Sequence, residues 1–431
     1  MPFSDLGLRS ELLRGVHDLG FAGPTPIQRD AIPPAALGRD VIATAQTGSG
    51  KTAAFVLPIL HRIAGKPRGT TRALVLTPTR ELAAQIDEHL KRLARHTPFS
   101  AAAVFGGVGM KPQEQAFRKG VDVLVATPGR LLDHFRFGYA ALAGVEILVL
   151  DEADRMLDMG FLPDIRRILR HLPAKRQTLL FSATMPTPIV ALAREMLQDP
   201  VTISAAAKAA PAAGITHAAY PVPSELKSAL LVELLKRGEL RSVLAFTRTK
   251  HRANRLAEYL LRHGIAAGRI HGNRSQGQRT EALAAFKTGR FPVLVATDIA
   301  ARGIDVDALS HVVNFDVPGS AEDYVHRVGR TARAGASGDA FLFVSPEEEA
   351  ALRDIERALG QRLPRVAVTG FDYSRRPAQK LEVPLAQRLA DMRSRAAAGR
   401  ERWRAGSPQR RRRPAAPHAG RTRRQSLGRA S

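Results

Sequence analysis

The chain has 431 residues, 44% of them hydrophobic, which is enough for two or three domains with substantial cores. It contains no cysteine, which excludes disulfides and cysteine-based zinc sites and fits a reducing compartment. The formal net charge of +25 favours a polyanionic partner, nucleic acid first and an anionic membrane second. Because no apolar run approaches a membrane span and residues 1–15 lack a signal-peptide layout, we expect a soluble, cytoplasmic protein.

Six short apolar runs between Asp40 and Thr184 predict buried strands. The runs are DVIATA, RALVLTP, SAAAVFGG, VDVLVATP, VEILVLDEAD and QTLLFSAT. Most are continuously apolar, as expected for strands that are buried on both faces of a sheet. Amphipathic stretches such as TRELAAQIDEHLKRLARH separate them. This alternation predicts an α/β domain with a doubly wound parallel sheet over residues 1–205.

An Ala- and Pro-rich stretch over residues 201–223 interrupts the alternation. We predict a linker at 206–223, and an irregular loop within one domain is the alternative. Alternation resumes in RSVLAFTRT, AAGRIHG, FPVLVATDIA, LSHVVNFDVP and GDAFLFVS, which predict a second α/β domain over 224–365. VLVAT recurs at Val123 and Val293, and Thr-Arg recurs at Thr79 and Thr247, at nearly equal offsets. These echoes predict two copies of one fold.

Residues 45–52, AQTGSGKT, nearly match the phosphate-loop pattern G-x-x-x-x-G-K-[ST], with Ala45 in place of the first glycine. A predicted strand precedes the run and a predicted helix follows it, as a phosphate loop requires. The N–H groups at the helix N-terminus would face phosphates. Lys51 would contact the β and γ phosphates, and the Thr52 hydroxyl would hold Mg²⁺. The second half has no Gly-Lys-Thr, so its role must differ.

An acidic run follows the predicted strand Ile147–Leu150. Asp151 and Glu152 therefore lie at the carboxyl edge of the sheet, where ligands bind. Asp151 suits Mg²⁺, and Glu152 can accept a proton from an attacking water. A helix N-cap with acidic first-turn residues is the alternative, but it explains one acidic residue rather than three in four positions.

The motifs DEAD at Asp151–Asp154 and SAT at Ser182–Thr184, in this order, resemble the DEAD-box ATP-dependent RNA helicases. The stretch EADRMLDMGFLPDIRRILRHLPAKRQTLLFSATMP resembles the bacterial RhlE-type branch in particular. The resemblance covers Phe3 to Leu363. It implies two RecA-like doubly wound domains, ATP and Mg²⁺ as cofactors, and RNA bound without regard to sequence. It also accounts for Ala45, since family members commonly carry alanine there.

The resemblance implies a nucleotide site that is split between the domains. Gln28, in a motif within residues 1–29, reads adenine, and a carboxamide is suited to pair with adenine N6 and N7. The full nucleotide-binding set is Phe21, Gln28, Ala45, Gln46, Thr47, Gly48, Ser49, Gly50, Lys51, Thr52 and Asp305. The metal ligands are Thr52 and Asp151, and the catalytic residues are Lys51, Asp151, Glu152, Arg330 and Arg333. The spacing of the two arginines predicts one helix face, from which they act as arginine fingers.

RNA contacts are implied for short loops whose N–H, hydroxyl and guanidinium groups grip phosphates and sugars rather than base edges. Taken singly, each loop could be an ordinary turn. The residues are Pro78, Thr79, Arg80, Gly106, Gly107, Thr127, Pro128, Gly129, Arg130, Arg248, Gln276, Arg279, Thr297 and Gly303. Coupling between RNA and nucleotide is implied for Asp154, Ser182, Thr184, His326 and Arg327. ATP and RNA together would close the domains and assemble the site.

The last segment is strongly basic, with 17 Lys+Arg and 3 Asp+Glu from Ser374 to Ser431. We expect residues 366–431 to be disordered when free and to tether RNA through their arginine clusters, with Trp403 as a candidate for base stacking. A dispensable solubilising extension is the alternative. For the whole chain, the rivals to an RNA helicase are an ATP-gated RNA scaffold or annealing protein and a DNA translocase. Monomeric behaviour is expected, and a role in ribosome assembly or RNA decay stays open.

Overall fold

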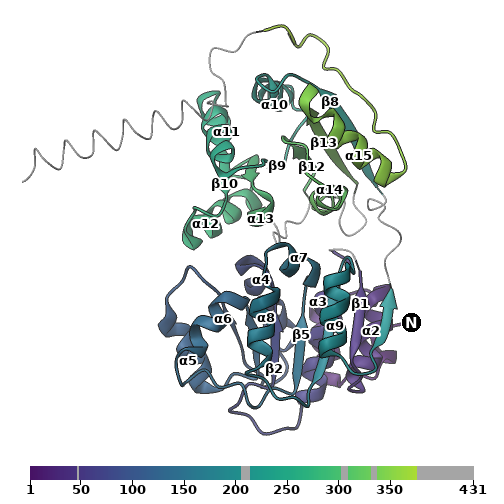
Figure 1. The fold of residues 1–431 in the computed structure, drawn as a ribbon, viewed down its shortest axis with the longest axis vertical. Helices are drawn as coiled ribbons and strands as arrows, with labels where there is room; N and C mark the ends of the chain where they lie inside the picture. Colours follow the sequence, from purple (N-terminus) through teal and green to yellow (C-terminus); the bar gives the residue numbers. More distant parts are fainter. Residues whose placement is uncertain (46–47, 205–213, 302–308, 332–336, 376–431) are drawn as a thin grey trace, which may run out of the picture. The chain divides into compact units, whose positions relative to one another are not determined.

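The computed structural model describes residues 1–45, 48–204, 214–301, 309–331 and 337–375. All of them belong to one compact unit, Met1–Leu381. They form two parallel sheets with helices on both faces, so the predicted fold class of two RecA-like α/β domains is confirmed (Figure 1). No helix in the described part of the chain combines the length and the apolar character needed to cross a membrane.

The first sheet contains seven of the described strands, and all neighbours pair in parallel. Its order is β3-β4-β2-β5-β6-β1-β7. The strands are β1 (Val41–Thr44), β2 (Ala73–Leu76), β3 (Ala101–Val104), β4 (Val123–Ala126), β5 (Ile147–Leu150), β6 (Gln177–Ser182) and β7 (Val201–Ser204). The first six coincide with the six predicted runs.

The second sheet contains six of the described strands in the order β10-β11-β9-β12-β13-β8, again all parallel. They are β8 (Ile215–Pro221), β9 (Val243–Phe246), β10 (Ala267–Ile270), β11 (Val293–Ala296), β12 (His311–Asn314) and β13 (Gly338–Val344). This order repeats that of β3-β4-β2-β5-β6-β1. The echoed VLVAT segments form the equivalent strands β4 and β11, and the echoed Thr-Arg pairs follow the equivalent strands β2 and β9. Two copies of one fold are therefore confirmed.

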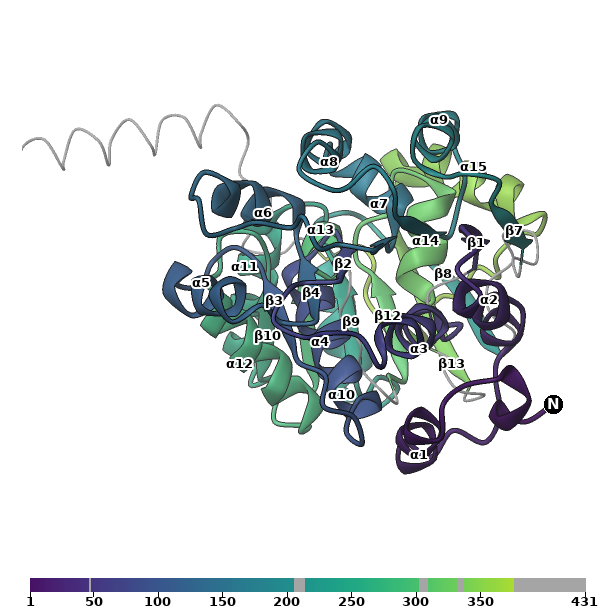
Figure 2. The same ribbon diagram turned by 90° about the horizontal axis from the view of Figure 1, so that it is seen from below.

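Two separate cores explain why the strand sequences are continuously apolar. In β2, Ala73 and Val75 join one core, whereas Leu74 and Leu76 join the other. The first core is covered by η1 (Phe3–Leu6), α1 (Ser10–Asp18), α2 (Pro26–Ala36), α3 (Lys51–Ile63) and α4 (Arg80–Leu93) (Figure 2). The second is covered by α5 (Met110–Lys119), α6 (Pro128–Phe135), α7 (Ala153–Asp158), α8 (Leu162–Leu169) and α9 (Thr187–Met196). Each fully buried Val or Leu contributes about 1.5–3 kcal/mol.

The second sheet is enclosed in the same way. One core packs against α10 (Lys227–Lys236) and α11 (Lys250–Arg262). The opposite face packs against α12 (Gln276–Lys287), α13 (Asp298–Ala301), α14 (Ala321–Val328) and α15 (Glu349–Leu359), the last preceded by η2 (Pro346–Glu348). Parallel strands with helices on both faces place the carboxyl ends of the strands at one edge, where the predicted site residues lie.

The predicted linker at 206–223 is too long, because strand β8 occupies residues 215–221 and pairs with β13 along its length. Residues 205–213 lie outside the described residues. Both strands that flank this gap, β7 and β8, are edge strands of their sheets. Edge strands are buried less completely, and the mixed sequence of β8, ITHAAYP, does not show the apolar run that identified the central strands.

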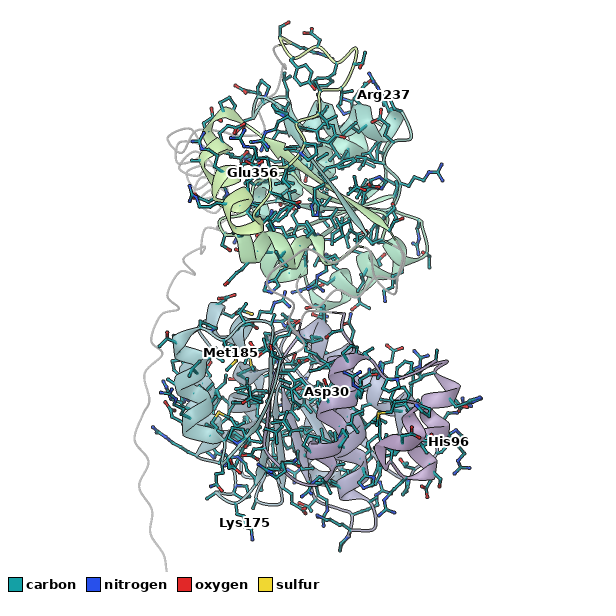
Figure 3. All side chains as sticks on the ribbon, turned by 90° about the vertical axis from the view of Figure 1, so that its right-hand side faces the viewer. Asp30, His96, Lys175, Met185, Arg237 and Glu356 are labelled. Carbon is teal, nitrogen blue, oxygen red and sulfur yellow. The ribbon has the colours of Figure 1, made fainter. Side chains whose placement is uncertain are left out.

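The predicted tail begins too early, because residues 366–373 pack onto the second domain. Val368, Phe371 and Tyr373 join the core beneath α10 and α11. The Val366 N–H donates to the Ala219 carbonyl at 2.8 Å, and Arg237 Nη1 donates to the Thr369 carbonyl at 2.9 Å. Glu356 holds the entry to this segment by accepting from Leu363 N–H at 2.7 Å; Arg237 and Glu356 are labelled in Figure 3. Residues 376–431, with Trp403 and the arginine clusters, lie outside the described residues.

Candidate nucleotide site and RNA-contact loops

The predicted phosphate loop connects β1 to α3, and Lys51 is the first residue of α3. Its ammonium is buried and donates to the Ala45 carbonyl at 2.8 Å, so Ala45 and Lys51 close the loop on itself. Gly50 is the N-cap of α3 with φ of 91°, a left-handed conformation that favours glycine. The predicted site residues Gln46 and Thr47 lie outside the described residues.

Gln28 connects the start of α2 to the phosphate loop by hydrogen bonds. Its Oε1 accepts from the Thr25 N–H at 2.9 Å in a capping box at the start of α2, and its Nε2 donates to the Gly50 carbonyl at 3.1 Å. A Cβ on Gly50 would lie 2.4 Å from that Nε2, so the approach requires glycine. Phe21 is half-buried and stacks on Phe3 with ring centroids 5.9 Å apart. Of the predicted adenine-side residues, Gln28 is thus linked directly to the phosphate loop.

Asp151 follows β5 at the same sheet edge and is buried. Burial raises the pKa of its carboxyl, and the negative charges of Glu152 and Asp154 add to this effect, while Lys51 opposes it. A positive charge close to Asp151 would therefore be strongly stabilising. The carboxylate also accepts from the Glu152 N–H at 3.0 Å, which fixes its orientation at the end of the strand.

Glu152 has an unusual backbone, with φ of 53° in a residue that is not glycine. Such a conformation costs about 1–3 kcal/mol and tends to occur at functional sites. It turns the chain sharply from β5 into α7, and the Glu152 carboxylate forms a buried ion pair with Arg155. Burial alone would raise the pKa of Glu152, but the positive charges of Arg155, Lys51 and Arg330 outweigh it and lower the pKa. Glu152 is therefore held ionised.

The third acidic residue joins the two motifs of the first domain. Asp154 Oδ2 accepts from the Ala183 N–H at 3.0 Å, the Thr184 N–H at 2.8 Å and the Thr184 hydroxyl at 3.1 Å. The Asp154 N–H in turn donates to the Ser182 hydroxyl at 3.1 Å. Through these bonds, a displacement of the segment after β6 would also move the start of α7. A coupling role for Ser182 and Thr184 requires such a connection.

The predicted RNA-contact residues of the first domain lie in loops at helix N-termini. Thr79 caps α4, Thr127 caps α6, and Pro128 and Gly129 begin α6. The Arg80 guanidinium lies against Gly106 and Gly107, and Arg130 Nη1 donates to the Val108 carbonyl at 3.0 Å. The three loops are thus linked by two arginines, although they are separated in sequence.

We expect a Gly107→Ala variant to weaken RNA binding about tenfold while ATP binding is retained. Gly107 has φ of 85°, and a Cβ there would lie 2.0 Å from Arg80 Nη1, so the arginine must move away. RNA affinity measured by anisotropy, beside ATP affinity measured with a fluorescent analogue, would test this. Gly319→Ala is the control, because an added Cβ meets no atom within 4 Å there and Gly319 is not among the predicted RNA-contact residues. Equal RNA affinities of the two variants would contradict the expectation.

In the second domain, Arg327 is buried, and its Nε and Nη2 donate to the two carboxylate oxygens of Asp298 at 2.6 and 2.8 Å. Its Nη1 donates to the Asp316 carbonyl at 2.7 Å. Arg330 donates to the His326 carbonyl at 3.3 Å. Burial lowers the pKa of His326, and the nearby charge of Arg155 lowers it further. Arg155, Arg327 and Arg330 also line one small cavity, so these groups from the two sheets meet.

One geometric prediction about the arginines is wrong. Helix α14 ends at Val328, with Gly329 as its C-cap, so Arg330 lies in the following turn rather than on a helix face. The helix ends at this glycine, a residue with low helix propensity, before Arg330 is reached. Arg333, Gly303 and Asp305 lie outside the described residues. Thr297 is described and directly precedes α13, with its N–H bonded to the Ile270 carbonyl at 3.3 Å.

Glu81 is a further site residue that the sequence argument missed. It accepts from Gln276 Nε2 at 3.2 Å and pairs with Arg279 Nη2 at 2.7 Å, and both its carboxylate and Arg279 are largely buried. These two partners were predicted to contact RNA, but here they bind the first turn of α4. The signal was the acidic residue beside Arg80 in PTREL, a charge with no local partner in the sequence.

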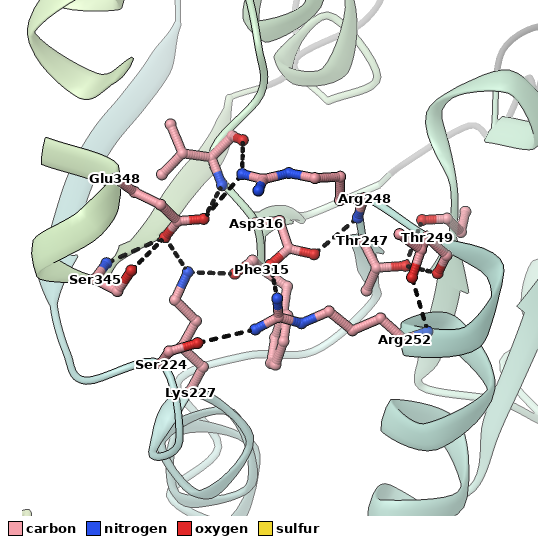
Figure 4. A network of polar contacts seen from close by, with 12 residues as sticks. Ser224, Lys227, Thr247, Arg248, Thr249, Arg252, Phe315, Asp316, Ser345 and Glu348 are labelled. Carbon is pink, nitrogen blue, oxygen red and sulfur yellow. Dashed lines mark hydrogen bonds and ion pairs between the residues drawn. The ribbon is translucent and has the colours of Figure 1, made fainter. Parts of the chain in front are cut away.

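The second sheet carries a counterpart of the nucleotide site, filled by its own side chains (Figure 4). Lys227 begins α10 after β8, as Lys51 begins α3 after β1, and Asp316 follows β12 as Asp151 follows β5. Lys227 is fully buried, pairs with Glu348 and donates to the Phe315 carbonyl at 2.9 Å. Asp316 accepts from the Arg248 N–H at 2.8 Å. Internal carboxylates thus neutralise the cations at this edge.

Arg248 was predicted to contact RNA, and its partly exposed guanidinium lies 3.3 Å from Glu348 Oε1 and 3.4 Å from the Val317 carbonyl. Arg252 reaches Asp316 Oδ1 at 3.0 Å from α11. The network in Figure 4 therefore ties four separate segments of the second domain together. Because Lys227 and Asp316 are buried, the loss of the partner of either one leaves an uncompensated charge.

We expect Lys227→Met to destabilise the protein by about 3–5 kcal/mol, because it leaves Glu348 without its buried cation. Replacing both Lys227 and Glu348 by apolar residues should recover part of this loss, since no charge is then stranded. Urea unfolding midpoints followed by circular dichroism would measure both. A single variant as stable as the parent chain would show that the pair contributes nothing; Lys236→Met on the same helix is the control.

With the phosphate loop and Glu152 on one sheet, and Arg330 acting on Glu152 from a second sheet of the same topology, the molecule falls in the class of two-domain phosphate-loop ATPases. Residues 25–192 match the family described as DEAD/DEAH box helicase, and residues 226–335 match the helicase conserved C-terminal domain. The chain belongs to the DEAD-box ATP-dependent RNA helicase family.

Relatives and solved structures agree with this assignment. The chain is 42% identical over 379 residues to the DEAD-box ATP-dependent RNA helicase CshA of Bacillus cereus, covering 88% of this chain and 72% of that protein. It is 42% identical to RhpA of Helicobacter pylori, covering 84% and 73%. Among solved structures, it resembles S. cerevisiae Dbp5 bound to RNA and ADP BeF3, with a TM-score of 0.76, 32% identity and coverage of 85% and 95%. It also resembles Mss116p bound to ssRNA and AMP-PNP, with a TM-score of 0.78, 27% identity and coverage of 86% and 79%.

Proposed function

We propose that RNA switches on ATP hydrolysis in this chain by joining the two domains, and that the same closure separates RNA strands locally. The chain is an ATP-dependent RNA helicase by family, and the proposal concerns how its residues divide the work. The observation that carries it is the split site. Lys51, Asp151 and Glu152 lie on the first sheet, whereas Arg330 acts on Glu152 from the second.

In the first domain, Lys51 binds the β and γ phosphates, and Glu152 takes the proton of the attacking water. The lowered pKa of Glu152 supports this role, because an ionised carboxylate is required to accept a proton. Thr52 and Asp151 would hold Mg²⁺, which would supply positive charge to offset that of the phosphates. A buried carboxylate whose pKa is raised by burial fits a site that takes up a cation.

RNA would lie along the loops that carry Arg80, Gly107 and Arg130 and along those of the second domain that carry Arg248 and Thr297. Their donors suit phosphates and sugars, so binding would be independent of sequence. Arg330 and Arg333 would complete the nucleotide site on closure. His326 and Arg327 would couple the binding of RNA to the nucleotide site. The bonds from Asp154 to Ser182 and Thr184 support a coupling role in the first domain.

Three finer assignments belong to this proposal. The stretch from Glu152 to Pro186 resembles the RhlE-type branch, and we assign the chain to it. We infer a cytoplasmic protein, since the absence of cysteine fits a reducing compartment, and we expect it to be monomeric. Action on RNA in ribosome assembly or RNA decay is consistent with contacts that do not select a sequence.

We expect RNA, but not DNA of the same sequence, to stimulate steady-state ATP hydrolysis at least about tenfold, because closure assembles the catalytic groups. A coupled ATPase assay with RNA, DNA or no nucleic acid would measure this. Stimulation by both nucleic acids would favour a DNA translocase. Tight ATP-dependent RNA binding without stimulated turnover would favour a scaffold, and either result would overturn the proposal.

A further inference from the structure

An open hollow of about 750 Å³ lies on the first domain, away from the residues assigned above. Its lining comes from two segments. Met110, Glu114 and Arg118 belong to α5, and Arg136, Phe137 and Tyr139 belong to the segment that follows α6. A concave surface that combines aromatic and basic side chains is a candidate binding site.

The aromatic side of the hollow is exposed and rigidly supported. Phe137 is 51% exposed, and it is the only aromatic residue among the exposed large hydrophobic residues of the described chain. Its ring lies parallel to that of Tyr139, with centroids 5.6 Å apart and planes 4° apart. The Tyr139 hydroxyl lies 2.9 Å from His134 Nδ1, and His134 is bonded in turn to Gln113 at 3.0 Å. Phe137 therefore presents a fixed flat face to solvent.

Two arginines, Arg118 and Arg136, line the hollow beside this face. The Arg118 guanidinium lies over the Tyr139 ring at 5.2 Å, and Arg136 is exposed at the rim. Glu114 pairs with Arg118 at 2.7 Å and so offsets one charge, but Lys111 and Lys119 on the same helix are exposed. A planar aromatic face inside a basic rim matches an unstacked base with its phosphate. An acidic peptide would match the rim but has no use for the flat face.

The hollow also continues the surface that is proposed to bind RNA. Val108, 41% exposed, directly follows Gly107, and its carbonyl receives the hydrogen bond of Arg130. Met110, two residues further on, already lines the hollow. A strand that lies on the Gly107 and Arg130 loops would therefore need only a short extension to reach Phe137.

We propose that this hollow is an accessory RNA subsite, in which one base of a single strand stacks on Phe137 and a neighbouring phosphate meets Arg136. The inference rests on the proposed path of RNA over the first domain. It extends that path beyond the loops that carry Gly107 and Arg130. It would make the affinity for RNA depend on strand length without adding sequence preference, because every base has a face to stack.

The test compares two single-stranded oligouridylates, one of about six nucleotides and one extended to about twelve nucleotides at the 5′ or the 3′ end. Binding is measured by fluorescence anisotropy with the full chain and a non-hydrolysable ATP analogue. The parent chain should bind one extended strand about tenfold more tightly than the short one. Phe137→Ala should remove most of this advantage. Leu37→Ala, which removes another exposed side chain of the first domain, should preserve it.

Direct stacking has its own signal. The chain has a single tryptophan, Trp403, so a Phe137→Trp variant in a Trp403→Phe background carries one indole in the hollow. The extended strand should quench its fluorescence, and Arg136→Gln should weaken the salt dependence of binding. Unchanged fluorescence on saturation with the extended strand would overturn the proposal, as would equal length dependence in Phe137→Ala and the parent chain.

These outcomes are separable from the failure of the proposed function. If RNA of either length fails to stimulate ATP hydrolysis by the parent chain, the proposed function is wrong. If stimulation is present but Phe137→Ala and Leu37→Ala have the same ratio of long-strand to short-strand affinity, only the subsite is wrong. The hollow would then be a surface for another kind of partner, such as an acidic peptide.

Discussion

A Glu152→Gln variant is expected to lose RNA-stimulated ATP hydrolysis by about 10²–10⁴-fold and to keep its affinity for ATP. The substitution preserves the size of the side chain and one oxygen that can bond to Arg155, but it removes the group that accepts a proton. Burial would by itself disfavour ionisation. The positive charges that lower the pKa of Glu152 therefore keep it ionised, which is the form that can accept a proton. Steady-state turnover and the affinity for a fluorescent ATP analogue are the two measurements.

The matched control for this experiment is Glu195→Gln. Glu195 also pairs with an arginine in the first domain, Arg166 at 2.7 Å, but both side chains are about half exposed. Loss of an exposed ion pair costs little, so this variant should hydrolyse ATP like the parent chain. A Glu152→Gln variant with undiminished turnover would refute the assignment of the base. Loss of ATP binding along with turnover would show that the substitution had damaged the strained turn instead.

The central strands and the loops that follow them were predictable because their causes are local. A strand such as β5 that is buried on both faces must be apolar at every position, and the charged residues at its end then stand out in the sequence. The same reasoning predicted Asp151 at the carboxyl edge of the sheet, and the phosphate-loop pattern predicted Lys51 at the start of a helix after β1; both positions are confirmed. The edge strand β8 was missed because its sequence is not continuously apolar, with Thr and Pro at its exposed positions and His at a half-buried one. The docking of Phe371 and Tyr373 was missed because their segment has no apolar periodicity.

Contacts between distant residues were not predictable in the same way. Glu81 and Arg279 are 198 positions apart in the chain, and nothing in either neighbourhood specifies the partner. Lys227 and Glu348, 121 positions apart, form a buried pair at the place where the other sheet has its phosphate loop. The absence of Gly-Lys-Thr predicted that the second site must differ. Only the folded chain reveals that its own carboxylates occupy it.

Arg330→Ala is expected to lower RNA-stimulated hydrolysis by about 10³-fold or more, with ATP and RNA each still bound. Arg330 belongs to the second domain, and its positive charge lowers the pKa of Glu152 on the first domain. Glu152 lies at the edge where the γ-phosphate would be cleaved. An arginine finger stabilises charge that develops in the transition state, so its loss should reduce kcat rather than ground-state binding. Single-turnover hydrolysis with saturating RNA is the decisive measurement.

The control for Arg330 must separate chemistry from folding, because this side chain is buried and donates to the His326 carbonyl. Arg330→Lys keeps the charge but loses the planar fork, so it should also be slow if bidentate contact is required. Arg357→Ala, an exposed arginine of the second domain, should behave like the parent chain. If Arg330→Ala melts at the parent temperature and hydrolyses ATP at the parent rate, closure of the domains does not deliver a catalytic group from this turn. Rapid hydrolysis by Arg330→Lys alone would mean that positive charge, rather than the geometry of the guanidinium, is what the second domain supplies.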